Sequence, residues 1–103
     1  MTETAGHRQA KENAAGVNGK TEVPLSGGRR LDALTLGGRA TEVERSGTAK
    51  GLEAAARRLR DADANQHVLR VPQKDIDAAA EAMHKIGVRG TVRNLAGTKR
   101  RSV

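Results

Sequence analysis

Three acidic residues lie close together in the stretch RRLDALTLGGRATEVER, residues 29–45. Asp32 precedes a Gly-Gly turn, and Glu42 and Glu44 follow it, one residue apart. Converging carboxylates repel one another unless a hard cation lies between them, and Mg²⁺ prefers such oxygen ligands. A bound cation could activate water and neutralise charge on a phosphodiester under attack. The stretch is therefore either a solvated hairpin face or a metal site.

The choice depends on the register of the hairpin. Side chains alternate faces along a strand, so Glu42 and Glu44 are expected to share a face. A two-residue loop would place Asp32 opposite Val43, on the other face from both glutamates. A three-residue loop over residues 37–39 would place Asp32 opposite Glu44, and all three carboxylates would converge. A slip of one residue switches between these outcomes, so both stay open at this stage.

Hydrophobic periodicity and turn residues predict the elements that position these acids. Strands are expected over residues 21–25, 31–36, 39–45, 66–71 and 88–93, and helices over residues 7–15, 49–62 and 73–86. The last strand, helix and strand form a βαβ unit, which implies a parallel strand pair. The order αβββαβαβ predicts an α/β fold with a small mixed β-sheet flanked by helices. Residues 1–94 are expected to form a single domain, followed by a basic tail over residues 95–103.

The net charge of +7 is concentrated at the C-terminal end. Residues 1–47 contain seven basic and six acidic residues, residues 48–87 contain the same numbers, and residues 88–103 contain five basic residues and no acid. This excess suits contact with phosphate groups, although a solvated end is the alternative. The candidate nucleic-acid contacts are Arg29, Arg30, Arg89, Arg93, Lys99, Arg100 and Arg101.

Composition excludes several classes of function. The chain has no Phe, Tyr or Trp, which excludes nucleic-acid binding by stacking of bases on aromatic rings. It has no cysteine, which excludes disulfides and thiolate metal sites. No apolar run approaches the roughly 20 residues of a membrane span, and the N-terminal residues lack the apolar segment of a secretory signal. No membrane partner is therefore expected.

The order of a strand with Asp, a strand with Glu-Val, and then helix, strand, helix and strand resembles the restriction-endonuclease-like PD-(D/E)XK superfamily. The resemblance runs from about residue 6 to residue 94, through GHRQAKENAAG, GGRRLDALTLGGRATEVER and the elements that follow. The chain is most similar to small nuclease domains, of roughly 100 residues, at the C-termini of bacterial polymorphic and contact-dependent inhibition toxins.

The resemblance implies roles for several acids. Asp32 would be the first acid of the family's motif and Glu42 the second, and both would be ligands of Mg²⁺ or Mn²⁺. The backbone carbonyl of Val43 would be a further ligand. Glu12 would match the acid often found on the leading helix of the family, also near the metal.

The chain departs from the family at position 44. The family usually has lysine there, which orients the attacking water, and this chain has Glu44. Some restriction enzymes carry glutamate at this place, where it serves as a base or as a ligand. Lys50, at the start of the next helix, is a candidate replacement for the missing cation. The remaining alternative is an inactive site.

The expected function is therefore metal-dependent hydrolysis of DNA or RNA by a bacterial toxin domain. Such a domain would act in the cytoplasm, either of its own cell or of a target cell into which it is delivered. A cognate immunity protein, acidic to match the basic chain, would block it. Two alternatives stay open: a non-catalytic nucleic-acid-binding module and a protein-interaction module in which the acids only face solvent.

Overall fold

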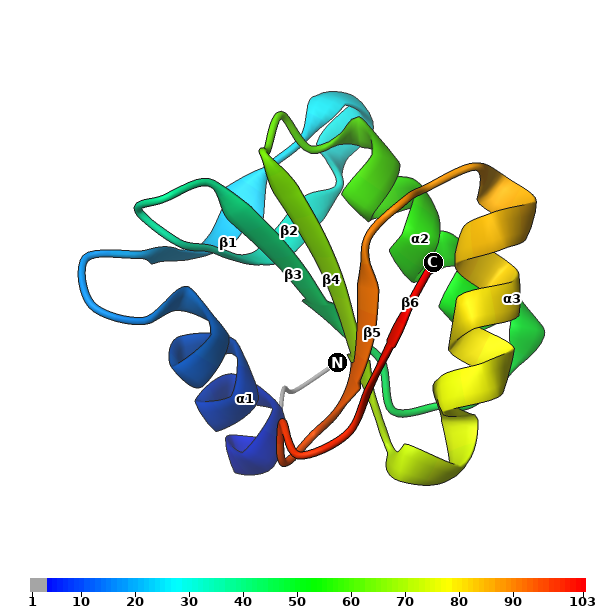
Figure 1. Ribbon diagram of the computed structural model, residues 1–103. Coiled ribbons are helices and arrows are strands. Elements are labelled where there is room, and N and C mark those ends of the chain that lie inside the picture. Colours follow the sequence, from blue (N-terminus) through cyan, green and yellow to red (C-terminus); the bar gives the residue numbers. More distant parts are fainter. Residues whose placement is uncertain (1–3) are drawn as a thin grey trace.

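One mixed sheet of six strands runs through the part of the chain that the computed structural model describes, residues 4–103 (Figure 1). The strands lie side by side in chain order. They are β1 (Lys20–Pro24), β2 (Arg30–Leu34), β3 (Arg39–Val43), β4 (Gln66–Val71), β5 (Thr91–Asn94) and β6 (Arg100–Ser102). The helices are α1 (Ala5–Ala15), α2 (Ala49–Asp61) and α3 (Ile76–Ile86), with single 3₁₀ turns η1 (Ser26–Gly28) and η2 (Gln73–Asp75).

The pairing of the strands divides the sheet into three parts. Strands β1, β2 and β3 pair antiparallel as two consecutive hairpins. Strands β3, β4 and β5 are parallel, with α2 and α3 as the connecting helices. Strand β6 returns antiparallel beside β5. The predicted mixed α/β fold is therefore confirmed, including the parallel βαβ unit.

Helices α2 and α3 pack together on one face of the sheet, and α1 packs on the other face against β1, β2 and β3 (Figure 1). The buried apolar face of α2 follows from its sequence. Leu52, Ala55, Ala56 and Leu59 recur at helical spacing, and all four are buried. The Thr48 hydroxyl accepts a hydrogen bond from the Gly51 amide and so caps this helix. The aliphatic core between these helices and the sheet fixes the position of β3, which carries Glu42.

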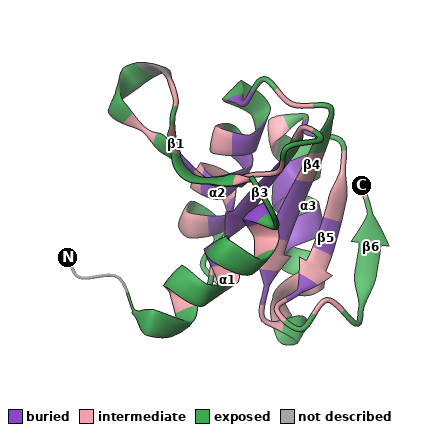
Figure 2. Ribbon diagram, turned by 90° about the vertical axis from the view of Figure 1, so that its left-hand side faces the viewer, coloured by how far each residue is buried: buried purple, intermediate pink, exposed green. Residues whose placement is uncertain are grey.

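Residues 95–103 differ from the predicted basic tail, because they turn back and add β6 to the sheet. The buried Asn94 closes the turn: its side-chain carbonyl accepts hydrogen bonds from the Thr98 and Lys99 amides, at 2.9 and 3.1 Å. Strand β6 is exposed at the edge of the sheet (Figure 2). Its basic side chains are therefore held at fixed positions on a strand.

Candidate functional site

The β2–β3 hairpin adopts a register that neither predicted loop gives. Leu34 pairs with Ala40. The Thr35 amide donates to the Arg39 carbonyl at 3.0 Å. The loop therefore consists of residues 36–38. Counting back along both strands, Asp32 comes to lie across from Glu42, at the point where the regular ladder ends.

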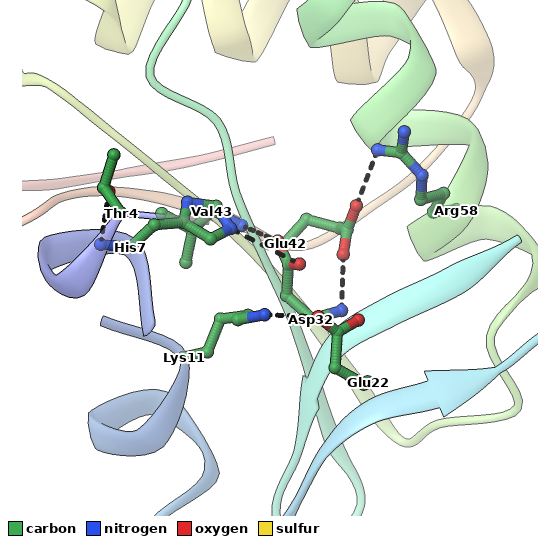
Figure 3. Close-up of polar contacts among 8 residues, drawn as sticks. All are labelled: Thr4, His7, Lys11, Glu22, Asp32, Glu42, Val43 and Arg58. Atoms are coloured by element: carbon green, nitrogen blue, oxygen red, sulfur yellow. Dashed lines mark hydrogen bonds and ion pairs between the residues drawn. The ribbon is translucent and has the colours of Figure 1, made fainter. Parts of the chain in front are cut away.

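At this point the two acids replace the backbone pairing with side-chain hydrogen bonds (Figure 3). Glu42 Oε2 accepts from the Asp32 amide at 2.7 Å. Asp32 Oδ2 accepts from the Val43 amide at 2.8 Å. Each carboxylate is thus held by the backbone of the opposite strand, which gives both acids a fixed position.

Glu42 is almost completely buried, with 1% of its surface exposed. Its Oε1 accepts a 2.9 Å hydrogen bond from Arg58 Nη1 of α2, and Figure 3 shows the carboxylate directed toward that helix. Burial, and next the negative charge of Asp32, raise the pKa of Glu42 to about 8, although the Asp32 amide and Arg58 oppose the shift. Glu42 therefore holds a proton near neutral pH.

Asp32 is directed toward α1, where its Oδ1 lies 3.7 Å from His7 Nε2 (Figure 3). It also lines an open depression of about 450 Å³. The other side chains around this depression include Glu44 and four arginines, Arg29, Arg30, Arg45 and Arg58. Guanidinium groups bind phosphate oxygens through paired hydrogen bonds. The depression therefore combines a carboxylate with several groups that suit a phosphate.

The other predicted acids do not join Asp32 and Glu42. Glu44 Oε1 accepts from the Ser46 amide at 3.0 Å, so its carboxylate is turned toward the loop that leads into α2. Glu12 is exposed on α1, and Lys50 is exposed at the start of α2. Among residues 4–103, no three acidic or histidine side chains are arranged as a group that could hold a metal ion.

Two contacts of the acids and one ion pair beside them (Figure 3) were not predicted from the sequence. Arg58 lies beside the apolar stripe of α2, and its approach to Glu42 depends on how that helix packs. His7 reaches Asp32 from α1. Lys11 of α1 is buried and forms an ion pair with Glu22 of β1. Helical spacing places none of these near the hairpin, because each contact joins segments that are distant in sequence.

The exchange Arg58→Gln is expected to raise the pKa of Glu42 further. The reason is that the charge of Arg58 and its hydrogen bond both favour the ionised carboxylate. A pH titration of the Glu42 carboxyl carbon by NMR measures the shift. Arg57→Gln is the matched control, because Arg57 lies one position away in α2 and pairs with Glu53. Equal Glu42 titrations in the two variants would contradict the assigned contact.

The donor chemistry of Asp32 and Glu42 fits a hard cation. Mg²⁺ commonly takes one or two carboxylates and completes its shell with waters and phosphate oxygens. A buried carboxyl group whose pKa is raised beside a second carboxylate would be ionised by a nearby divalent cation, with release of its proton. The proton of Glu42 and the guanidinium of Arg58 are the two competitors of such an ion.

Comparison of the chain with protein-family models, with curated proteins and with solved structures gave no match. None of the described helices has the length and apolar character needed to cross a membrane.

Proposed function

We propose that this chain is a metal-dependent nuclease that hydrolyses phosphodiester bonds of DNA or RNA, on a restriction-endonuclease-like core. The observation that carries the proposal is the fixed position of the two acids on neighbouring strands: Glu42 accepts from the Asp32 amide, Asp32 accepts from the Val43 amide, and Asp32 lines a depression together with arginines. The order of the elements supports it, because the two acids lie on the antiparallel strands that precede the parallel part of the sheet.

In this proposal Asp32 and Glu42 hold Mg²⁺ or Mn²⁺. When bound, the ion supplies water activation and neutralises charge on the phosphodiester. The amides of Asp32 and Val43 keep the two carboxylates in place, and Arg58 orients Glu42 from the opposite side. Arg30 and Arg45, which line the depression, bind the phosphate.

We assign to Glu44 the role of accepting the proton of the attacking water. It lines the same depression as Asp32 and is only partly buried, so a bound substrate and its water can reach the carboxylate. A carboxylate in this place is a general base, whereas the lysine usual in the superfamily orients the water instead.

Plasmid DNA and tRNA are the substrates for the test, each with Mg²⁺ and with Mn²⁺. The proposal expects cleavage by the chain as it stands, or by Glu44→Lys if Glu44 has disabled the site. Absence of cleavage by both proteins would contradict the proposal. EDTA in a parallel reaction is the control for the metal, and it is expected to stop cleavage.

A nuclease of this kind suits a bacterial toxin that acts on nucleic acid in the cytoplasm. The cell that produces it would need a cognate immunity protein. Because the chain carries a net charge of +7, an acidic partner that covers the arginine-lined depression would bind it by charge complementarity. Such a partner would block access of nucleic acid to Asp32.

A second candidate function is nucleic-acid binding without catalysis. The arginines on the open face of β4, β5 and β6 favour it, because they offer phosphate contacts that need no metal. The two candidates differ in one result: the binding module retains nucleic acid in EDTA and leaves it intact when Mg²⁺ is added.

A further inference from the structure

Strands β4, β5 and β6 place three arginines side by side. Arg70 is paired with Arg93, and Arg93 is paired with Arg100. Residues paired across neighbouring strands share a face of the sheet. The next residue, Arg101, reaches Asp77 of α3 at 2.7 Å, so the row of three points away from α2 and α3. On this side, α1 packs against β1, β2 and β3, beside the part of the sheet that carries the row (Figures 1 and 2).

An open groove of about 390 Å³ lies on this part of the sheet. We call it the basic groove, and its lining includes Arg39, Gln66, Arg89, Thr91, Arg93 and Arg100. Four arginines line the groove: Arg39, Arg89, Arg93 and Arg100. Within residues 4–103, none of the four forms an ion pair with an acid, because the arginines that do so lie elsewhere. The Arg39 guanidinium donates from Nε to the neutral Gln66 side chain, at 3.0 Å. The groove therefore has positive charge that the described chain does not balance.

Arg70 and Arg93 extend this charge toward the loop before β6. Arg70 Nη2 donates to the Leu95 carbonyl at 2.8 Å, and Arg93 Nη2 donates to the Gly97 carbonyl at 3.2 Å. The Nε atoms of both arginines are buried without a hydrogen-bond partner among the described residues. Burial, and next the charge of Arg93, lower the pKa of Arg70. Two like charges held together without an acid favour an anion beside them.

The row of arginines leads to the acids of the hairpin. Arg70 is paired with Val43 of β3, and the Val43 amide holds Asp32. Neighbouring strands lie about 4.8 Å apart. Asp32, Arg70, Arg93 and Arg100 therefore follow one another across the sheet at intervals of one or two strands.

We propose that the basic groove and Arg70 form a binding track for the phosphate groups of a nucleic-acid strand, which crosses the sheet toward Asp32. Guanidinium groups in a fixed row suit repeated phosphates, since each can donate two hydrogen bonds to one phosphate. A protein partner is disfavoured because protein interfaces depend on aromatic and apolar anchors. Val68, the one aliphatic residue that lines the groove, is buried. Cleavage near Asp32 rests on the proposed function, whereas binding along the track does not.

Arg100→Gln and Arg101→Gln are a matched pair that tests the track. Both residues are exposed on β6 and both exchanges remove one positive charge, but the two side chains lie on opposite faces. Fluorescence anisotropy with labelled DNA and RNA oligonucleotides in EDTA gives the affinity at several salt concentrations. Arg100→Gln is expected to reduce the slope of log K against log salt by about 0.7–0.9, and Arg101→Gln to leave it unchanged. Equal slopes in the two variants would overturn the proposal.

Two further measurements distinguish phosphate binding along the track from a folding defect and from an acidic protein partner. Thermal unfolding of both variants shows whether a loss of binding follows a loss of folding, and similar midpoints are expected because both side chains are exposed. Competition with polyglutamate and with polyphosphate, at equal charge, tests the chemistry of the partner. Preferential displacement by polyphosphate is expected, and preferential displacement by polyglutamate would assign the face to an acidic protein and overturn the track.

Cleavage by the wild type and binding by the Arg100→Gln and Arg101→Gln pair together distinguish failure of the track from failure of the nuclease. Binding through Arg100 without cleavage by either the wild type or Glu44→Lys would overturn the nuclease and support the track. Wild-type protein that cuts, with Arg100→Gln and Arg101→Gln alike in binding, would overturn the track and support the nuclease.

Discussion

Asp32→Asn is expected to lower the rate of metal-dependent phosphodiester cleavage by about 10²–10³-fold, the effect typical of removing one preorganised electrostatic group. Asparagine keeps the size of the side chain and an oxygen that can accept from the Val43 amide. The backbone amide of residue 32 also stays available to Glu42. The variant therefore removes the charge at the proposed metal position and retains the local hydrogen bonds.

The rate is measured from plasmid relaxation and tRNA cleavage at saturating Mg²⁺. Asp63→Asn is the matched control, because Asp63 is an exposed residue in the connection between α2 and β4. The control is expected to cleave at the wild-type rate. If Asp32→Asn cleaved as fast as the control, Asp32 would have no part in the reaction and the assigned site would be wrong.

The stability of the wild-type protein is expected to fall as pH rises from about 4.5 to about 8, because of Glu42. The pKa of Glu42 is raised on folding, so the folded state binds more protons than the unfolded state within this window. Each pH unit then costs up to about 1.4 kcal/mol of unfolding free energy. Over the whole window the loss is a large share of the roughly 5–15 kcal/mol that stabilise a typical domain.

Glu42→Gln is expected to remove this dependence, because glutamine does not ionise and can still bond to the Asp32 amide. Urea denaturation at pH 5, 6.5 and 8 gives the free energy of unfolding for both proteins. The difference between the two unfolding free energies isolates Glu42 from other titrating groups. The stability of the variant relative to the wild type should increase as pH rises. Glu53→Gln, at a partly exposed position of α2, is the control and should follow the wild type. Parallel profiles for Glu42→Gln and wild type would show that Glu42 does not bind the proton.

The general fold could be predicted from the sequence because local patterns and the rules of chain connection determine it. The spacing of Leu52, Ala55, Ala56 and Leu59 predicts α2 and its buried face, and the structure confirms both. The last strand–helix–strand unit then makes β4 and β5 a parallel pair, as the sequence predicts. Apolar periodicity carries this information without knowledge of any contact that is distant in sequence.

The register of the hairpin could not be predicted in the same way. Two glycines mark the turn, but a loop over residues 36–38 and its alternatives differ by a single residue. Beyond the pair Ala33–Thr41, the side chains of Asp32 and Glu42 accept hydrogen bonds from backbone amides. Strand propensities do not describe such side-chain bonds. The expected convergence of three carboxylates is therefore not formed: Glu42 is directed toward Arg58 of α2, and Asp32 toward His7 of α1.

Two other features were also beyond local patterns. Strand β6 has the sequence RRS, which lacks the alternation of apolar and polar residues that marks a strand. It forms because Asn94 closes a turn that brings it beside β5. The contact of Arg58 with Glu42 depends on the packing of α2 against β3, which only the folded chain brings about.

Isothermal titration of Mg²⁺ and Mn²⁺ into the wild-type protein and Asp32→Asn, at pH 6.5 and pH 8.5, tests the proposed cation site most directly. The account predicts that the wild type binds an ion more tightly at pH 8.5, because the Glu42 proton then no longer competes. It also predicts that Asp32→Asn loses the binding. The account would be contradicted by a wild type that takes up neither ion at either pH, or by equal affinity in the two proteins.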